Sequence, residues 1–556
     1  MTSKKNRLRV IPLGGLDEVG KNMTVFEFDN DMVVIDAGLM FPDDDHPGVD
    51  LLLPDYSYIL KRKDKLRGII ITHGHEDHTG ALPYLLKDLG QAVPVLGTRL
   101  TLGLIRGKLE EHRIKHAKLR EIRPGGHVNL GQFGFDFIQM NHSIPDSVSV
   151  FVRTPVANVL HTGDFKLDQT PIDGRFTDFA GLGRVARQGV TLLMSDSTNA
   201  ESRGHTPSEA VVGEALREIF ATARQRIVVA CFASHIHRVQ QVCDAAVACG
   251  RKVVVTGRSM INTTHTAREL GYLHIDDADL IDAYEIGDVP AERVVVLCTG
   301  SQGEPLSALA RIANGDHRTV TIEHGDTVVI SATPIPGNEK AVSRVVNRLY
   351  KIGAIVIHKE VSGVHVSGHA SAEELKLVLN LVRPANFMPV HGETRHLHAH
   401  AELARSVGLA DGNIHILENG RCLEITHDGA RLGEHVTAGV LYVDGLAVGD
   451  LGRVVLRDRQ VLSSDGIVMV VVVVDTQDGS IVGETEVLAR GLVLGTDTES
   501  AIEDARARDD KVLTRLSAEG VTDQAVIKQA LRDSLSQHIW ETTRRRPMII
   551  PIVMEV

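Results

Sequence analysis

Apolar and polar positions at the start of the chain form short segments that predict β-strands. These segments are rich in Val, Ile, Leu and Phe, and each one ends at Gly, Asp or a polar turn. They are residues 8–15, 23–28, 32–38 and 66–72. From residue 78 onward, helical patterns alternate with further strand patterns, at 92–97, 135–140, 147–153 and 158–164. This order predicts an α/β architecture in which polar residues follow the strand ends.

The pattern changes after residue 200 to a longer alternation of helices and fully apolar strands. Helical patterns cover residues 206–223 and 237–250. The apolar strand patterns are residues 226–232, 252–257, 293–300 and 327–334. Continuous apolar strands between helices are typical of a doubly wound parallel sheet, and we predict one here.

Residues 364–393 return to the His-rich strand ends of the first part, which indicates an inserted domain. We therefore predict that residues 1–208 and 362–450 form one discontinuous domain and that residues 209–361 form the insertion. Residues 451–556 are predicted to be a linker and a C-terminal α+β domain. Its expected strands and helices are strands 466–475, 491–495 and 548–556, and helices 501–516 and 522–543.

The composition is that of an ordinary globular protein, with 43% hydrophobic and 24% charged residues. We expect a cytoplasmic protein without a membrane segment, because the start has no signal-peptide core and the apolar run at 467–475 is too short to cross a bilayer. The five cysteines are scattered without a CxxC pair, which argues against disulfides and thiolate metal sites. The net charge of −12 alone argues against a polyanionic partner, although bound divalent ions would add positive charge locally.

The stretch HGHEDH, directly after the apolar run at 66–71, indicates a metal centre. One turn at a strand end could aim His73 and His75 at one ion, and Asp77 and His78 at a second. Imidazole and carboxylate groups suit zinc or manganese. A solvent-exposed polar turn is the alternative interpretation.

Three further strand-end residues complete the predicted ligand set: His142, Asp164 and His391. Asp164 can bridge two ions, so the first centre is His73, His75, His142 and Asp164. The second centre is Asp77, His78, His391 and Asp164. His161 lies close in sequence to Asp164, but we place it around the site and not among the ligands.

The order of these motifs resembles the metallo-β-lactamase fold. Several further motifs resemble the β-CASP nucleases, and within them the bacterial ribonuclease J family. They are LGGLDEVGKNM, IDAGLMFP, MSDSTNA, FASHIHR, TGSQGEP, SATPIPGNE and GVHVSGHAS. The resemblance implies a metallo-β-lactamase αββα sandwich with an inserted β-CASP parallel-sheet domain and a C-terminal α+β domain.

The resemblance also implies a two-metal ribonuclease that degrades single-stranded RNA from a 5′-monophosphate and cleaves it internally, in RNA decay and in rRNA and mRNA maturation. The motifs of the insertion are rich in hydroxyl, imidazole and amide donors, as a phosphate site requires. The candidate phosphate-binding residues are Ser234, His235, His237, His365, Val366, Ser367, Gly368 and His369. We expect residues 300–305 to open a helix whose amides add to this site.

The departing 3′ oxygen needs a positioned acid, and the resemblance offers Asp196 and His369 as the candidate catalytic pair. Which of the two carries the proton stays open. The resemblance also implies a structural Ca²⁺ held by Asp50 and Asp444, with exposed loop acids as the alternative. It further implies a homodimer and association with other RNA-decay proteins. The basic run at 544–546 fits a solvated face or an RNA contact.

Two other functions are compatible with parts of the pattern. The same metal pair could attack a lactam, thioester or lactone in a small-molecule hydrolase, but such an enzyme has no need of the inserted domain. A metal-inactive RNA-binding scaffold is the second alternative. A scaffold of that kind would lose ligands, whereas this chain keeps all seven.

Overall fold

The computed structural model describes residues 6–43, 45–304, 306–334, 338–358, 363–449, 452–476, 480–492 and 498–556. Two compact units divide the chain: residues 1–41 with 51–441, and residues 42–50 with 442–556. Among the described residues, no helix has both the length and the apolar character to span a bilayer.

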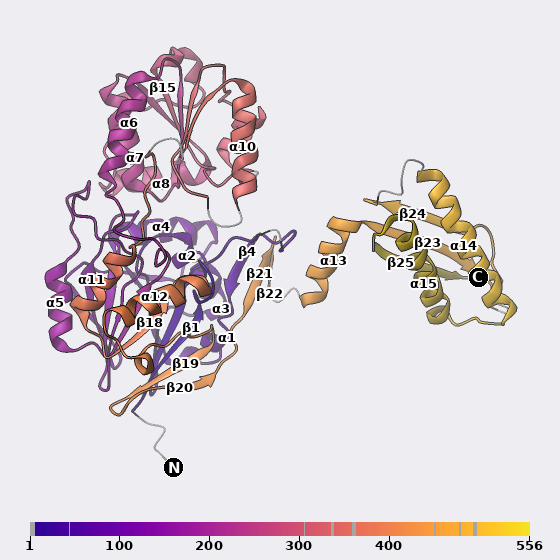
Figure 1. Cartoon of the computed structure of the whole chain (residues 1–556), viewed down its shortest axis with the longest axis horizontal. Helices are drawn as coiled ribbons and strands as arrows, with labels where there is room; N and C mark the ends of the chain where they lie inside the picture. Colours follow the sequence, from indigo (N-terminus) through magenta and orange to yellow (C-terminus); the bar gives the residue numbers. More distant parts are fainter. Residues whose placement is uncertain are drawn as a thin grey trace. The chain divides into compact units, whose positions relative to one another are not determined.

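Two sheets face each other in the larger unit, with helices on their outer faces (Figure 1). The first sheet has the order β20 (Gly429–His435), β19 (Arg421–Thr426), β1 (Leu8–Gly14), β2 (Met23–Phe28), β3 (Asp31–Ile35), β5 (Leu66–Ile70), β6 (Pro94–Gly97) and β7 (Lys118–Glu121). The second has the order β18 (Asn386–Val390), β12 (Leu192–Asp196), β11 (Asn158–His161), β10 (Val148–Arg153), β9 (Phe133–Gln139) and β8 (His127–Leu130).

Strands from distant parts of the sequence pair in both of these sheets. β1 pairs with β19, and β12 pairs with β18, so residues beyond 363 complete sheets that begin before residue 200. A shared apolar core lies between the sheets and includes Phe26, Phe135 and Val150. The surrounding helices are α1 (Ser57–Leu60), α2 (Glu76–Thr79), α3 (Leu82–Leu89), α4 (Arg99–Glu111), α5 (Phe179–Gln188), α11 (Ala372–Val382) and α12 (Thr394–Ser406).

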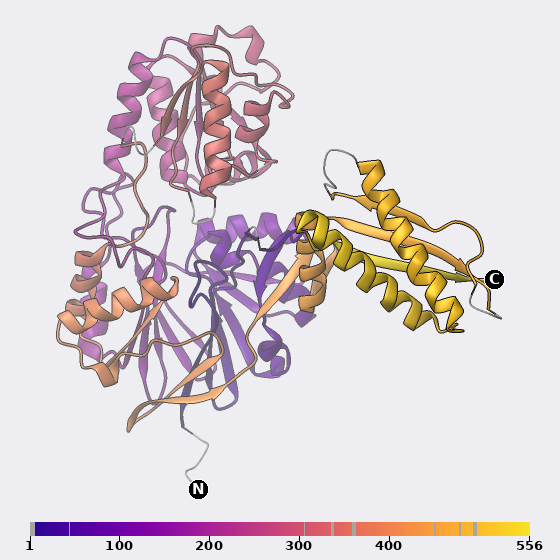
Figure 2. The ribbon, with the colours of Figure 1, turned by 45° about the vertical axis from the view of Figure 1, so that its right-hand side comes forward.

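The intervening residues form a separate lobe around a parallel sheet, seen in two orientations in Figures 1 and 2. Its strand order is β14 (Lys252–Thr256), β15 (Val294–Cys298), β13 (Ile227–Ala230), β16 (Thr327–Ile330) and β17 (Ile355–His358). Its helices are α6 (Ala210–Thr222), α7 (Ile236–Ala248), α8 (Arg258–Glu269), α9 (Ala308–Asn314) and α10 (Glu339–Ile352). β13 and β15 are buried along their whole length, because helices cover both faces of the sheet. The predicted doubly wound sheet is confirmed.

The smaller unit contains a three-stranded sheet with the order β24 (Glu486–Arg490), β23 (Ile467–Val474) and β25 (Met548–Glu555). Buried and half-buried residues alternate along β23, since one face packs against helices. The helices are α13 (Gly452–Asp465), α14 (Thr498–Ala518) and α15 (Gln524–Thr543). The remaining elements are β4 (Leu51–Pro54), β21 (Val440–Asp444), β22 (Ala447–Gly449), η1 (Lys63–Lys65), η2 (Asp277–Asp279), η3 (Ile286–Asp288), η4 (Ala291–Arg293) and η5 (Asp411–Asn413).

Two element predictions differ from the structure, and one helix was not predicted. The strand predicted at 491–495 does not cover residues 491–492, since the strand found here is Glu486–Arg490, and residues 493–495 lie outside the described ranges. α13 was not predicted. The helix expected to open at 300–305 begins at Ala308 instead and has seven residues, so residues 300–304 lie outside its first turn.

The predicted domain boundaries stay predictions. Those at 361/362 and 450/451 fall on residues outside the described ranges, and so do residues 335–337 of the SATPIPGNE motif and Pro305 of the TGSQGEP motif.

Candidate metal centre

The predicted ligands all lie at the carboxyl ends of strands, where backbone direction and sheet packing fix their positions. His73 and His75 follow β5, and Asp77 and His78 lie on the short helix α2. His142 follows β9, Asp164 follows β11, and His391 follows β18. Side chains at neighbouring strand ends meet at one edge of a sheet. The two facing sheets therefore deliver ligands from both sides.

The HGHEDH turn is held against the loop after β3 by backbone bonds. Ala37 N donates to His78 O over 2.8 Å, and Leu39 N donates to Glu76 O over 3.1 Å. A Cβ atom on Gly38 would lie 1.5 Å from Asp77 O, so only glycine permits this approach. The close packing fixes the backbone of the ligand-bearing turn.

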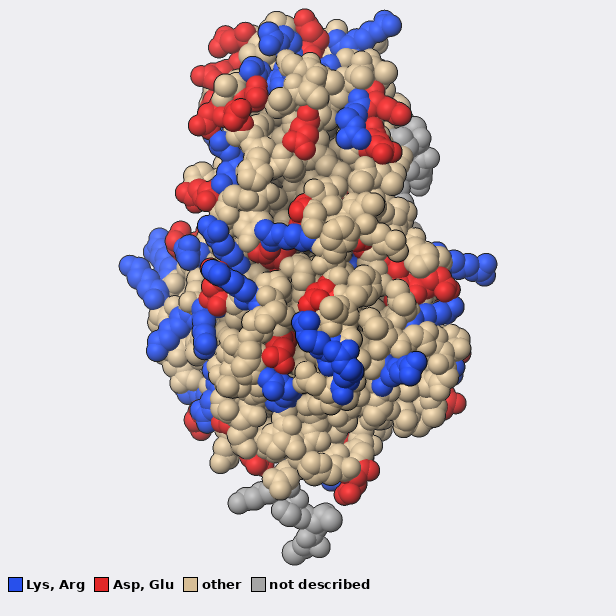
Figure 3. Space-filling view, turned by 90° about the vertical axis from the view of Figure 1, so that its left-hand side faces the viewer, with Lys and Arg blue, Asp and Glu red and all other residues tan. Residues whose placement is uncertain are grey.

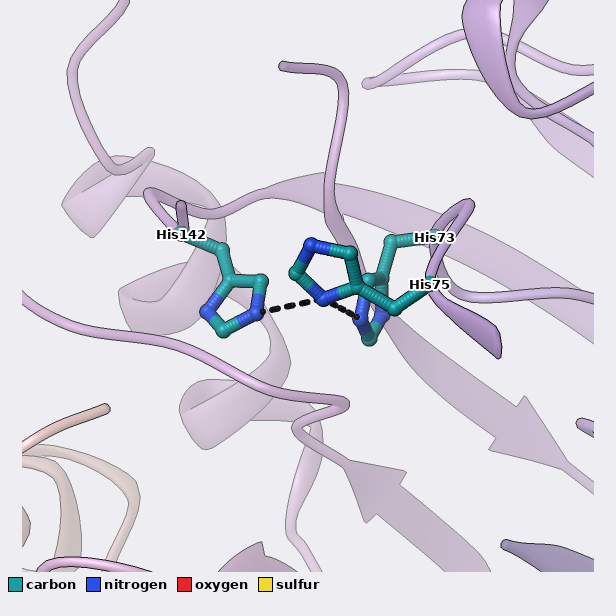
Figure 4. Close-up of side chains that lie close together, drawn as sticks. All are labelled: His73, His75 and His142. Atoms are coloured by element: carbon teal, nitrogen blue, oxygen red, sulfur yellow. Dashed lines mark hydrogen bonds between the residues drawn. The ribbon is translucent and has the colours of Figure 1, made fainter. Parts of the chain in front are cut away.

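Three histidines form the first group, with their ring nitrogens converging on a common point (Figure 4). His75 Nδ1 lies 3.0 Å from His73 Nε2 and 3.1 Å from His142 Nε2. Burial lowers the pKa of His75 to about 4 and the pKa values of the other two rings well below their usual range. Neutral imidazoles present lone pairs, which is the form that binds a metal ion.

Asp77, His78, Asp164 and His391 form the second group. Asp164 Oδ2 lies 3.2 Å from His78 Nε2 and 3.3 Å from His391 Nε2. Burial lowers the pKa of His78 and of His391, but the nearby carboxylate of Asp164 more than offsets this and holds both pKa values above normal. The second group therefore favours positive charge at its centre, which either a proton or a metal cation can supply.

Asp164 lies between the two groups. Its Oδ2 atom is 3.8 Å from His73 Nε2 and 3.9 Å from His142 Nε2, as well as close to the histidines of the second group. Within the described residues, neither ring nitrogen of His391 has a hydrogen-bond partner of good geometry, although the residue is only 2% exposed. Buried nitrogens of this kind need a partner, and a divalent ion fits both the donor types and the charge.

Two partners that sequence analysis missed orient the ligand rings. Asp36 Oδ2 lies 2.8 Å from His78 Nδ1, and the same carboxylate accepts bonds from the backbone and hydroxyl of Thr72. His142 Nδ1 lies 2.8 Å from the carbonyl of Gly368. Such contacts fix the tautomer and leave Nε2 for the metal. In the sequence, Asp36 stands only at the end of an apolar run, which carries no signal of its role.

Gly368 therefore contributes a backbone carbonyl to the metal centre, in addition to its predicted place in the phosphate site. A Cβ atom there would lie 2.8 Å from His142 Cε1. His161 lines a small cavity beside the second group, of about 10 Å³, and accepts a bond from Gly163 N. Its place around the site agrees with the prediction.

Asp196 and His369 are brought together beside the second group. His369 Nδ1 lies 2.7 Å from Asp196 Oδ2 and 4.0 Å from Asp164 Oδ2. Burial lowers the pKa of His369, but Asp196 raises it, with a net value of about 9. Asn199 Nδ2 donates to His369 O over 3.0 Å and to Ser367 Oγ over 2.9 Å. The side-chain amide of Asn199 thus positions both the catalytic candidate His369 and the phosphate-site candidate Ser367.

The phosphate-site candidates come from two segments that Arg238 joins. This fully buried side chain on α7 donates from Nη1 to Val364 O over 2.9 Å and from Nε to Glu209 Oε1 over 2.6 Å. His235 caps the N-terminus of α7. His237 instead faces Asp173, with 3.2 Å between Nε2 and Oδ2.

The acids predicted to hold calcium have protein partners. Asp50 Oδ2 accepts from Gly445 N over 2.7 Å, and Asp444 forms an ion pair with Arg459. The calcium site stays a prediction, and the Arg459 guanidinium already supplies positive charge there. In the basic run, Arg544 and Arg546 lie over the ring of Trp540, and Arg545 pairs with Asp465.

Known proteins resemble this chain over its whole length. The metallo-beta-lactamase superfamily model matches residues 16–208, and the ribonuclease J beta-CASP domain model matches 224–349. The Zn-dependent metallo-hydrolase RNA specificity domain model matches 355–417, and the ribonuclease J C-terminal domain model matches 454–556.

The chain is 45% identical to ribonuclease J of Mycolicibacterium smegmatis, over 99% of this chain and 97% of the relative. It is 42% identical to ribonuclease J2 of Bacillus subtilis over the full length of both. The chain belongs to the ribonuclease J family. The predicted resemblance, the fold class and the interpretation as a metal-dependent ribonuclease are confirmed at the level of the family.

A solved structure supports the fold alone. A protein of unknown function from Enterococcus faecalis V583 superposes with a TM-score of 0.53 at 13% identity, over 75% of this chain and 100% of that chain. The family and the buried His/Asp cluster also indicate that the chain binds divalent metal. The negative net charge, which alone argued against a polyanionic partner, was therefore a poor guide to the substrate class.

Proposed function

We propose that this chain hydrolyses RNA with two divalent ions per subunit, either zinc or manganese. In this proposal it digests 5′-monophosphorylated RNA from the 5′ end and also cleaves internally, in RNA decay and in rRNA and mRNA maturation. The observation that carries the proposal is the convergence of the predicted ligands around Asp164 Oδ2. The proposed ligands are His73, His75, Asp77, His78, His142, Asp164 and His391.

When bound, such ions supply a water of lowered pKa and neutralise charge on the phosphoryl oxygens. The chain itself contributes fixed geometry, because most of the ligands are buried and they stand at strand ends of two packed sheets. The buried walls exclude bulk water and strengthen the electrostatic interactions inside the site.

His369 is the proposed proton donor to the departing 3′ oxygen. Asp196 holds its Nδ1 atom at 2.7 Å and fixes the ring, so Nε2 is the nitrogen that can be turned toward substrate. Asp196 orients the ring and stabilises its charged form. An imidazole poised in this way can also return the proton after release of the product.

A pocket for the 5′-phosphate is proposed from the two segments that Arg238 joins. Its residues are Ser234, His235, His237, His365, Val366, Ser367, Gly368 and His369. Hydroxyl, imidazole and amide donors suit a phosphate. Support comes from Asn199, which ties Ser367 to the catalytic candidate His369, so a phosphate bound at Ser367 would lie near the scissile bond.

We further propose a homodimer that acts in the cytoplasm with other RNA-decay proteins. The sheet of the smaller unit leaves Ile550, Ile552 and Met554 between 37% and 52% exposed, and an apolar row of this kind favours association. The dimer stays a prediction, and sedimentation of the purified chain tests it.

The activity is tested with three single-stranded RNAs of one sequence, carrying a 5′-monophosphate, carrying a 5′-triphosphate, or closed into a circle. The chain is stripped with a chelator and reloaded with zinc, manganese or both. We expect mononucleotides from the monophosphorylated RNA and slower internal cuts in the circle. Asp77→Ala should abolish both products while RNA is still retained in a gel shift.

Other outcomes separate the alternatives. Cleavage of none of the RNAs with any ion, together with tight RNA binding, would identify a scaffold. Hydrolysis of lactones without RNA cleavage would identify a small-molecule hydrolase. Ser367→Ala should reduce 5′ digestion more than cleavage of the circle, with Ser208→Ala as a control outside the pocket; equal loss of both activities would refute the pocket.

A further inference from the structure

The segment from the end of β11 to the first residue of α5 exposes large apolar side chains next to the metal centre. Phe176 is 59% exposed and Phe179 is 44% exposed, and Ile172 on the same segment is 36% exposed. Most phenylalanines of the chain are buried in its cores, so two exposed rings within four residues are unusual. Burial in the core of this chain does not account for them.

Hydrogen bonds fix this segment directly beside a predicted metal ligand. Asn141, the residue before His142, donates from Nδ2 to Arg175 O over 2.6 Å. Its Oδ1 atom accepts from the Thr177 backbone over 3.0 Å and from the Thr177 hydroxyl over 2.9 Å. The exposed rings therefore stand on a backbone whose position is set by the residue next to His142.

The other side of the segment contacts the inserted lobe. Asp173 Oδ2 lies 3.2 Å from Nε2 of His237, a phosphate-site candidate. Arg175 forms an ion pair with Asp146, and its guanidinium stands 5.4 Å from the ring centre of Tyr272. The segment thus borders both the metal centre and the proposed phosphate pocket.

The segment and α5 also carry two arginine side chains, each paired with an acid: Arg175 with Asp146 and Arg184 with Asp178. The Arg175 side chain is 48% exposed, and the Arg184 side chain on α5 is 55% exposed. Figure 3 shows the side of the molecule that carries α5, where Lys and Arg are most frequent across the middle of the face, with Asp and Glu among them. Exposed aromatic rings among basic side chains match single-stranded RNA, whose bases stack on the rings while its phosphates face the cations.

We propose that Phe176 and Phe179 form a stacking platform for RNA bases that lie outside the metal centre. The proposal rests on the proposed function, because it takes RNA as the substrate. The platform would bind any sequence, since every base presents an aromatic face. It would hold the strand on the enzyme between successive cleavage steps.

The test measures binding of a ten-nucleotide single-stranded RNA to the full chain after chelation, so that no cleavage occurs. We expect Phe176→Ala with Phe179→Ala to weaken binding about ten-fold or more. Phe176→Tyr should retain wild-type affinity, because the ring is kept. Tyr284→Ala is the matched control, since Tyr284 is an aromatic residue of the inserted lobe that is 78% exposed.

A second arm separates stacking from charge. An oligomer of the same length with abasic sugars should bind the wild type and the double variant equally. Arg184→Gln should instead weaken binding of both oligomers and reduce the salt dependence. Two results would overturn the platform: unchanged affinity of the double variant for normal RNA, or an equal loss of affinity for the abasic oligomer. Unchanged affinity for normal RNA would instead favour a protein partner as the molecule that covers these rings.

A third set of measurements distinguishes failure of the stacking platform from failure of the proposed ribonuclease function. With metal restored, the double variant should cleave a 5′-phosphorylated dinucleotide at the wild-type rate but release fewer nucleotides per binding event from long RNA. If the wild-type protein cleaves neither substrate, the ribonuclease proposal is refuted. The RNA-binding measurements on the chelated protein would still show whether the stacking platform exists. A double variant that is as processive as wild type would overturn the platform alone.

Discussion

Two buried polar clusters of the larger unit differ in how their charges are satisfied. The metal centre collects histidines and acids, and three of its rings present nitrogen atoms to one another. The second cluster, here called the hinge cluster, lies where the chain enters the inserted lobe. It contains Lys166, Asp168, Glu209 and Arg238.

In the hinge cluster every charge has an opposite charge from the protein. Arg238 Nε lies 2.6 Å from Glu209 Oε1, and Lys166 Nζ lies 3.5 Å from Asp168 Oδ2. Glu209 N also donates to Asp168 Oδ2 over 3.0 Å. A cluster of this kind is complete without an added ion, whereas the metal centre needs a cation from outside. The comparison shows that the type of donor, and not burial alone, identifies a metal site.

The largest predicted effect concerns the metal centre. Asp164→Ala removes the atom shared by both groups, so we expect RNA hydrolysis to fall about 1,000-fold or more, because several kcal/mol of transition-state stabilisation are lost. Elemental analysis should show loss of bound metal. His161→Asn is the matched control and should keep its metal; loss of the ion there as well would contradict the ligand assignment.

Substitutions in the hinge cluster should change the stability of the protein but not its metal content. Glu209→Gln leaves the Arg238 guanidinium buried without a counter-charge, so the free energy of unfolding should fall by about 3–5 kcal/mol. Urea unfolding measures this, and chelation should not change the difference. Replacing both residues, Glu209→Leu with Arg238→Met, should recover much of the loss. A double variant as unstable as the single one would contradict the ion-pair explanation.

Asp509 on α14 sharpens the comparison, because neither oxygen of this buried carboxyl group has a hydrogen-bond partner of good geometry among the described residues. Burial raises its pKa to about 7, so the folded state keeps it largely protonated below neutral pH. Its contribution to stability is full below about pH 4 and is lost as the pH rises through about 7, by about 1.4 kcal/mol for each pKa unit.

Asp509→Asn should therefore remove this pH dependence. Fluorescence of Trp540, the single tryptophan, reports unfolding of the same unit. Below pH 4 the two proteins should be similar in stability, and at pH 8 the variant should be the more stable. Parallel stability curves from pH 4 to 8 would show that Asp509 is ionised in the folded chain.

The smallest predicted effect concerns Asp36, which orients His78. Asp36→Asn should weaken metal affinity by about 10- to 100-fold, as loss of a carboxylate behind a ligand histidine does. Asn tolerates the left-handed backbone of this residue, where φ is 62°. Metal titration followed by activity measures the change. Asp29→Asn, at φ 52°, is the matched control and should bind metal normally.

Local sequence sufficed for the contiguous features of the molecule. The apolar runs predicted many of the strands of the two large sheets and most strands of the parallel sheet of the insertion, and HGHEDH indicated the metal centre. Short apolar segments bounded by Gly and Asp carry this information within about ten residues. Predictions failed where local periodicity was weak, as at the start of α9 and at β24.

The contacts around the site were not available from the sequence. Neither the bond from Asp36 to His78 nor the bond from His142 to the carbonyl of Gly368 leaves a pattern along the chain. The same holds for the full burial of Arg238, the last residue of the FASHIHR motif. The two bonds join residues 42 and 226 positions apart, so they depend on how sheets and lobes pack.

The sequence by itself determined the kinds of ligand, their order and the strands that carry them, because side-chain chemistry and hydrophobic periodicity are local properties. The tertiary structure alone decided that Asp164 lies between two groups of histidines, that Asp196 meets His369, and that the hinge cluster neutralises itself. Packing of two sheets brings distant strand ends within a few ångströms, and no local rule encodes that distance.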